Sequence, residues 1–131
     1  MPFAAASAAA ISSRSNVRLP VVASGLQWLS TAANEIHAGP NAARLIDKFG
    51  YPLDKARALE VSAKVLPLIE KHLSEHQWLA LGRPTIADCA VFPYVATGWE
   101  GGVTLERYRA IQAWIDRIKS LPGYIGMPGI K

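Results

Sequence analysis

Apolar side chains recur along this chain with the roughly 3.6-residue period of an α-helix, whereas the alternation typical of a β-strand persists nowhere. We expect the first helix to begin near Pro20, because proline suits a first helical turn, and to end at Gly39-Pro40. The apolar positions of this helix form a stripe along one side, which predicts that the helix buries that side against the rest of the protein. Its members follow at steps of four, three, four and three residues: Val22, Leu26, Leu29, Ala33 and Ile36.

Two further helices follow the same period before the middle of the chain. A short one is expected over residues 41–49. Asp54 then caps a long helix, in which Pro67 removes one backbone donor and should produce a kink. The apolar side of this long helix is predicted to consist of Leu59, Ala63, Leu66 and Leu73, with Val65 and Ile69 beside them.

Residues 78–94, WLALGRPTIADCAVFPY, predict a loop, a helix start and a helix in that order. Thr85 can offer its side-chain oxygen to the backbone N–H of Asp88, and Asp88 can reach back to the N–H of Thr85, which makes a capping box. We interpret Asp88 as this structural cap and not as an acid–base catalyst, because the spacing accounts for it fully. The helix that follows is apolar almost all round, so we expect it to be central and buried, with Cys89 inside it and Pro93 bending or ending it.

The last long helix is expected to start at Thr104 or Leu105 and to stop at residues 121–123. Together these patterns predict an all-α bundle of four or five helices. At 131 residues the chain forms a single domain, which we place at residues 21–131 behind an Ala/Ser-rich extension over residues 1–20. The apolar stripe of the last helix consists of Tyr108, Ile111, Ile115 and Ile118, joined by Trp114.

Composition narrows the classes of function. Half of the residues are hydrophobic and 18% are charged, which excludes a disordered chain, and no apolar run approaches the roughly 20 residues of a membrane helix. The net charge of +4 is dispersed, and the aromatic residues do not interleave with the basic ones, so neither a nucleic acid nor a membrane is expected as a partner. The first twenty residues carry no acidic group, which is also typical of an organelle transit peptide; we prefer a loosely helical or mobile extension of a cytoplasmic protein.

Few residues suggest chemistry of their own. His72 and His76 share a helix face and could bind zinc, but no third ligand is evident, so we interpret both as a solvated helix end and predict no metal site. His37 is interpreted in the same way. The single cysteine, Cys89, excludes an intrachain disulfide. A tyrosine could support a thiolate only beside a thiol pocket, so packing roles are favoured for Tyr51, Tyr94, Tyr108 and Tyr124.

Four segments resemble the C-terminal domain of the glutathione S-transferase family. The T-x-x-D box of Thr85 and Asp88, which opens an apolar helix, is similar to the most distinctive local signature of that domain. The resemblance extends over about residues 21–129 and implies the all-helical fold of that domain. The other similar segments, in the order of the family, are residues 27–30 with 32–36, residues 100–103 with Leu105, and residues 113–118 with 121–124.

This resemblance implies one part of a two-part enzyme. In the family, a thioredoxin-like domain comes first, binds glutathione and carries the Ser, Tyr or Cys that stabilises the thiolate. The helical domain supplies most of the wall of the electrophile pocket. The residues before Val21 are too few for a four-stranded domain. We therefore carry over no catalytic residue, and we expect glutathione as a co-substrate only where a thioredoxin-like partner domain is supplied.

The resemblance also implies which residues line the electrophile pocket and which partners the chain has. Trp28, Asn34 and Tyr94 are the residues expected to face the electrophile cleft. In the family, one face of the helical domain docks against the thioredoxin-like domain. Without that domain the face would be an exposed apolar patch, so we expect either a homo-oligomer or a separate thioredoxin-like partner. The favoured function is a glutathione S-transferase-like chain that is inactive alone. The alternatives are a non-catalytic interaction or assembly module of the same fold and a carrier of a small apolar ligand.

Overall fold

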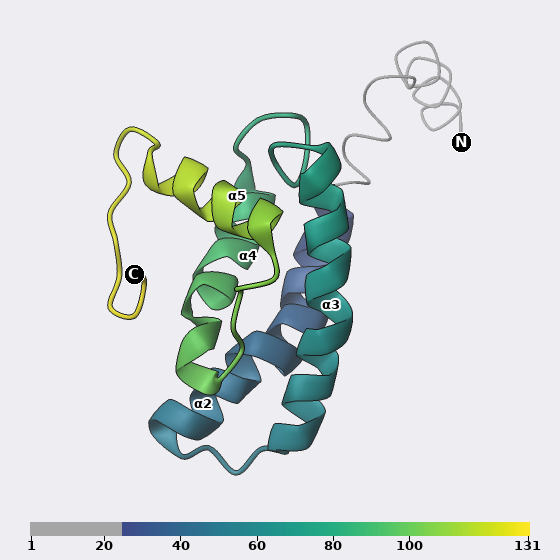
Figure 1. Cartoon of the computed structure of the whole chain (residues 1–131), viewed down its shortest axis with the longest axis vertical. Helices are drawn as coiled ribbons and strands as arrows, with labels where there is room; N and C mark the ends of the chain where they lie inside the picture. Colours follow the sequence, from purple (N-terminus) through teal and green to yellow (C-terminus); the bar gives the residue numbers. More distant parts are fainter. Residues whose placement is uncertain (1–24) are drawn as a thin grey trace, which may run out of the picture.

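The computed structural model describes residues 25–131, and every regular element in this range is helical, which confirms the predicted all-α bundle. Residues 25–31 are α-helical and lead into the first labelled element (Figure 1). The expected helix start at Pro20, the stripe residue Val22 and the extension over residues 1–20 lie outside the described residues. In chain order the elements are η1 (Ala32–Asn41), α2 (Ala42–Phe49), α3 (Lys55–Glu75), α4 (Ile86–Thr97), η2 (Gly98–Gly101) and α5 (Arg109–Lys119).

The first helix does not end at Gly39-Pro40, so that prediction is wrong. It continues as the π-helix η1 and passes directly into α2. A π turn is wider than an α turn, and the N–H of Ala42 reaches the carbonyl of His37, five residues back; this accommodates the ring and the missing N–H of the proline. Glycine suits the packed side, because a Cβ at position 39 would lie only 3.0 Å from the backbone nitrogen of Ser62 in α3, a tight contact.

The apolar stripe of this first helix is buried only in part. Ile36 is fully buried, and Ala32, which the stripe does not include, joins it in the core. Leu26 is 60% exposed and Ala33 is also exposed, contrary to the period that places both on the stripe. The helix packs against α3 and α4 through the neighbouring side, and no element within residues 25–131 covers these two positions.

α3 follows the sequence prediction at its start and departs from it along its length. The carboxylate of Asp54 caps the helix by accepting a hydrogen bond from the N–H of Arg57 at 3.1 Å. The helix continues through Pro67, which is exposed. Leu59 is 40% exposed and Ala63 is exposed as well, so their predicted burial is wrong, because the packed side is rotated by one position. The buried residues are Ala58, Ser62, Val65, Leu66, Ile69 and Leu73.

α4 is central in the bundle but is not buried all round. It continues through Pro93, and its outer side is uncovered by any other element in the described range. Ile86 is 68% exposed, Tyr94 is 38% exposed, and Cys89 is exposed although we predicted it to be buried. The inner side carries the buried residues Ala87, Asp88, Val91, Phe92, Val95, Ala96 and Thr97.

α5 begins later than the predicted Thr104 or Leu105, and the reason lies in another helix. The carboxylate of Glu70, in α3, accepts hydrogen bonds from the backbone N–H groups of Ala110 at 2.8 Å and of Ile111 at 2.9 Å. These are two of the first N–H groups of α5, which have no partner within their own helix. The start of α5 is therefore set by tertiary contact rather than by a local cap.

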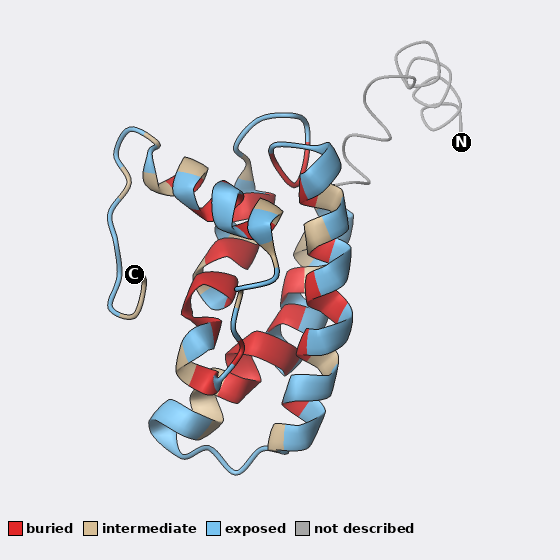
Figure 2. Cartoon of the chain, in the orientation of Figure 1, coloured by how far each residue is buried: buried red, intermediate tan, exposed pale blue. Residues whose placement is uncertain are grey.

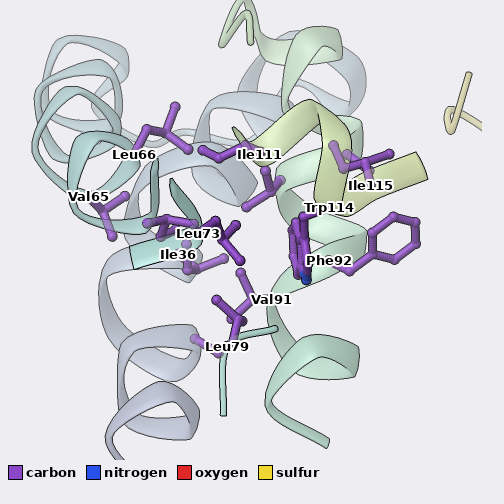
Figure 3. Packing of buried hydrophobic residues seen from close by; sticks show 14 of the residues in the cluster. Ile36, Val65, Leu66, Leu73, Leu79, Val91, Phe92, Ile111, Trp114 and Ile115 are labelled. Atoms are coloured by element: carbon purple, nitrogen blue, oxygen red, sulfur yellow. The ribbon is translucent and has the colours of Figure 1, made fainter. Parts of the chain in front are cut away.

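The hydrophobic core lies where η1, α3, α4 and α5 meet (Figures 2 and 3). Phe92 approaches Trp114 edge-on, with 6.0 Å between the ring centroids. α5 ends before residues 121–123, as predicted. Among the helices of residues 25–131, none has the length and apolarity needed to cross a membrane. The largest fully buried side chains include Trp114, Ile36, Ile69, Leu79 and Ile111.

Candidate functional site

A hollow of about 530 Å³ lies between the first helix and the outer side of α4. We call it the α4 hollow. Its two walls are held together by direct packing of η1 against α4. Most of the lining is apolar, so the hollow suits a small molecule with a hydrophobic body. The apolar lining comprises Leu29, Ala32, Ala33, Ala90 and Pro93, and the other lining residues are His37, Cys89 and Tyr94.

His37 is the lining residue whose orientation is most clearly fixed. Its Nδ1 lies 3.0 Å from the amide nitrogen of Asn41, one turn further along η1. Asn41 is buried, whereas His37 is exposed at the hollow. Because an amide nitrogen only donates, Nδ1 accepts, and the proton of the neutral imidazole is on Nε2. The sequence alone did not indicate this role, although the spacing of four residues between the two side chains is compatible with such a pair.

The structure separates the three residues that we expected to face the cleft. Tyr94 lines the α4 hollow. Asn34 is exposed, outside the lining, and its amide donates to the carbonyl of Ser30 at 2.8 Å. Trp28 also lies outside the lining and packs edge-on against His72, with 5.1 Å between the ring centroids. Contact of these residues with a substrate stays a prediction.

Asp88 is a structural hub at the start of α4. It forms the capping box with Thr85, whose backbone N–H donates to Oδ2 at 2.9 Å. Oδ1 accepts from the N–H of Leu79 at 3.1 Å and from the indole N–H of Trp114 at 2.8 Å. The Asp88 side chain is buried and both oxygens are occupied, so this carboxylate holds the core together and is not available to a substrate.

The two histidines at the end of α3 stack on each other. The ring centroids of His72 and His76 are 4.4 Å apart. Nε2 of His72 lies 3.3 Å from the carbonyl oxygen of Trp78, and Nδ1 of His76 lies 3.1 Å from the carbonyl oxygen of His72. In the part of the chain that the structure describes, no three His, Cys, Asp or Glu side chains gather as metal ligands would.

Ion pairs join α2 to η2 at residues that do not line the hollow. Glu100 pairs with Lys48 at 2.5 Å and with Arg44 at 3.2 Å, and its side chain is only 12% exposed. The hydrogen bond from Lys48, followed by that from Arg44, keeps the pKa of Glu100 below its ordinary value, although burial acts in the opposite direction. Gly101 packs directly on the backbone of Ala43, where a Cβ would overlap. These contacts hold η2 against α2.

Comparisons with known proteins point to one family. Residues 46–122 match the family model described as the glutathione S-transferase C-terminal domain. Among solved structures, the chain is similar to a glutathione S-transferase from Xanthobacter autotrophicus Py2, with 29% identity and a TM-score of 0.73 over 82% of this chain and 55% of that one. A glutathione S-transferase from Pseudomonas fluorescens Pf-5 matches with 27% identity and a TM-score of 0.79 over 86% of this chain and 58% of that one.

A possible glutathione S-transferase from Rhodopseudomonas palustris is similar as well, with 26% identity and a TM-score of 0.71 over 81% of this chain and 50% of that one. The chain thus spans between 50% and 58% of the length of these three structures. No curated protein matches the sequence significantly.

Proposed function

We propose that this chain, which belongs to the glutathione S-transferase family through its C-terminal domain, supplies the helical half of a glutathione S-transferase and lines the electrophile site with the α4 hollow. The match confirms the resemblance that we inferred from the box of Thr85 and Asp88 and the segments around it. Glutathione is held by a thioredoxin-like domain in this family. The hollow is therefore proposed to receive the electrophile and not the thiol.

One observation carries this proposal: residues patterned for burial surround the hollow and are uncovered. Ala33 belongs to an apolar stripe, and Cys89 belongs to a helix that is apolar almost all round, yet both are exposed at the hollow. Exposed apolar positions gathered around a concavity mark a surface that another molecule covers. A thioredoxin-like domain seated here would turn the hollow into a cleft between domains, where ligand sites are common.

His37 is the polar group best placed to act on an electrophile in the hollow. With Nδ1 held by Asn41, its Nε2–H is the group that can donate to a ligand. We infer that it donates to an oxygen of the electrophile on which negative charge develops during conjugation. The hydroxyl of Tyr94, on the wall formed by α4, is a second donor in the same hollow. Asn34 and Trp28 would contribute only to a substrate that extends beyond the lining.

We infer that the chain does not activate the thiol by itself, because in this family the thiolate-stabilising residue belongs to the thioredoxin-like domain. Conjugation of glutathione to 1-chloro-2,4-dinitrobenzene tests this inference. The 131-residue chain alone should not exceed the uncatalysed rate. Adding the separately produced thioredoxin-like half of the Pseudomonas fluorescens enzyme should give measurable turnover. Robust turnover by the chain alone would overturn the inference.

A matched pair of variants tests the docking face. Ala33→Arg places a charge at the rim of the hollow and should abolish the turnover that the added half restores. Leu68→Arg places the same charge on the exposed side of α3, where Leu68 is 66% exposed, and should leave it unchanged. If the two halves bind each other without any turnover, the alternative of a non-catalytic assembly module is favoured instead.

A further inference from the structure

A second concavity lies on the other flank of the α4 ridge that carries Cys89 and Pro93. This C-terminal cleft has a volume of about 370 Å³ and lies between the beginning of α4, the end of α5 and residues 121–130. Figure 1 shows the last residues running along the outside of the bundle past α5 and α4. Its volume is near the lower end of the roughly 300–1,000 Å³ of small-molecule sites, so its ligand would be small.

The walls of the C-terminal cleft define the chemistry of a ligand. Phe92 on α4, with Ile118 and Leu121 at the end of α5, gives an apolar surface. The one charged side chain in its lining is Asp88, and both oxygens of that carboxylate already accept hydrogen bonds from N–H groups of the protein. A ligand therefore finds no charge to pair with here, and a charged ligand would lose its hydration without compensation.

Tyr124 supplies the one buried side-chain oxygen of the cleft that lacks a hydrogen-bond partner. Its ring meets Phe92 edge-on, with 6.1 Å between the ring centroids. Its hydroxyl is shielded from solvent and has no hydrogen-bond partner. Every other buried side-chain nitrogen or oxygen in residues 25–131 has one. A buried tyrosine hydroxyl normally has a partner, and an unpaired one costs free energy. This hydroxyl is therefore a donor for which the described residues provide no acceptor.

The segment that covers Tyr124 is attached to the bundle at its last residues, where Ile130 packs against the hydrophobic core. The indole N–H of Trp99 donates to the carbonyl of Gly129 at 2.7 Å, and Nζ of Lys131 lies 4.0 Å from the centroid of the Trp99 ring. Ile125, between these contacts and α5, is 88% exposed. Gly123 has a φ of 80°, a left-handed conformation that favours glycine, and the chain turns away from the end of α5 at this residue.

We propose that the C-terminal cleft binds a small, uncharged aromatic molecule that carries one carbonyl oxygen, and that this oxygen accepts a hydrogen bond from the hydroxyl of Tyr124. The hydroxyl becomes reachable when the backbone beside it, at Gly126, moves outward; a Cβ at that glycine would lie 3.7 Å from the Tyr124 oxygen. The ligand's ring then lies in the cleft against Phe92. This site does not depend on glutathione or on the α4 hollow.

The test uses 6-propionyl-2-(dimethylamino)naphthalene, an uncharged aromatic ketone whose emission moves to the blue in apolar surroundings and to the red when its carbonyl accepts a hydrogen bond. The full chain should bind the probe saturably. Tyr124→Phe keeps the ring and removes the donor, so it should weaken binding about three- to tenfold and move the emission of the bound probe to the blue. Tyr94→Phe makes the same change at the α4 hollow and should alter neither quantity.

Three outcomes would overturn the proposal. The first is no saturable binding up to the solubility of the probe. The second is a Tyr124→Phe variant that binds with unchanged affinity and unchanged emission, which would remove the hydroxyl from the site. The third is an effect of Tyr94→Phe as large as that of Tyr124→Phe, which would place the probe in the α4 hollow. Because Tyr124→Phe only removes an unpaired hydroxyl, loss of folding does not complicate the comparison.

Discussion

The two sides of α4 have nearly the same apolar character but very different surroundings. On the inner side, Val91 is fully buried and Asp88 accepts hydrogen bonds from three separate backbone or indole N–H groups. On the outer side, Ile86 and Cys89 face outward and nothing else in residues 25–131 covers them. The bundle itself completes the inner face of this helix, and under the proposed function a second domain completes the outer face.

Removal of the Asp88 carboxylate, the hub of the inner side, should cause the largest loss of stability. Asp88→Ala should lower the free energy of unfolding by about 3 to 5 kcal/mol, because it leaves two buried donors and one part-buried donor without an acceptor. Urea denaturation followed by circular dichroism measures this value. Asp54→Ala is the matched control, since Asp54 caps α3 at the surface and its loss should cost about 1 kcal/mol. Equal losses in the two variants would contradict the role of Asp88 as a hub.

A second test compares the truncation of an apolar side chain on the inner and the outer side of α4. Val91→Ala should lower the free energy of unfolding by about 2 kcal/mol, because it removes two buried methyl groups and leaves a cavity. Ile86→Ala, at the 68% exposed position, should stay within about 0.5 kcal/mol of the parent chain. A loss at Ile86 comparable to that at Val91 would show that the outer side is already covered in the isolated chain, for example by self-association, which sedimentation would detect.

The smallest expected effect is a pH dependence at Glu100. Lys48 and Arg44 keep its pKa below the ordinary 4.5, so the ion pairs contribute their full stability above that pH and lose it as the pH falls through the lowered pKa. The difference in unfolding free energy between the parent chain and Glu100→Gln should therefore be constant near pH 7 and shrink below pH 4.5. Urea titrations at several pH values measure it.

Glu60→Gln is the control for that measurement. The pKa of Glu60 is also lowered, chiefly by its hydrogen bond from Lys64, but its side chain is 53% exposed and solvent screens the pair. We expect no measurable change with pH for this variant. If the unfolding free energies of Glu60→Gln and Glu100→Gln change alike with pH, the partly buried ion pairs of Glu100 contribute no more to stability than a surface pair.

Local patterns were sufficient for the parts of the fold that depend on neighbours in the chain. The T-x-x-D spacing indicated the start of α4, and Asp54 indicated the start of α3. Prediction failed where the course of a helix depends on more than the local sequence pattern. The start of α5 depends on Glu70 in another helix, and the passage of the first helix through Pro40 depends on a widened π turn.

The candidate site could be predicted only in part for the same reason. Tyr94 was expected at a cleft and lines the α4 hollow. The hydrogen bond from Trp114 to Asp88 joins residues 26 positions apart in the sequence, so no local pattern indicates it. The exposure of Ala33 and Cys89 was not foreseen, because periodicity reports that a position is apolar and not which molecule covers it. These failures themselves identify the surface on which the proposed function depends.

The position of Cys89 has a practical consequence. It is the only thiol of the chain, it is accessible, and it borders both the α4 hollow and the C-terminal cleft. A nitroxide or fluorophore attached there requires no engineered cysteine and would sense occupancy on either flank of the same ridge. One native sulfur atom thus offers a spectroscopic reporter for two distinct binding events.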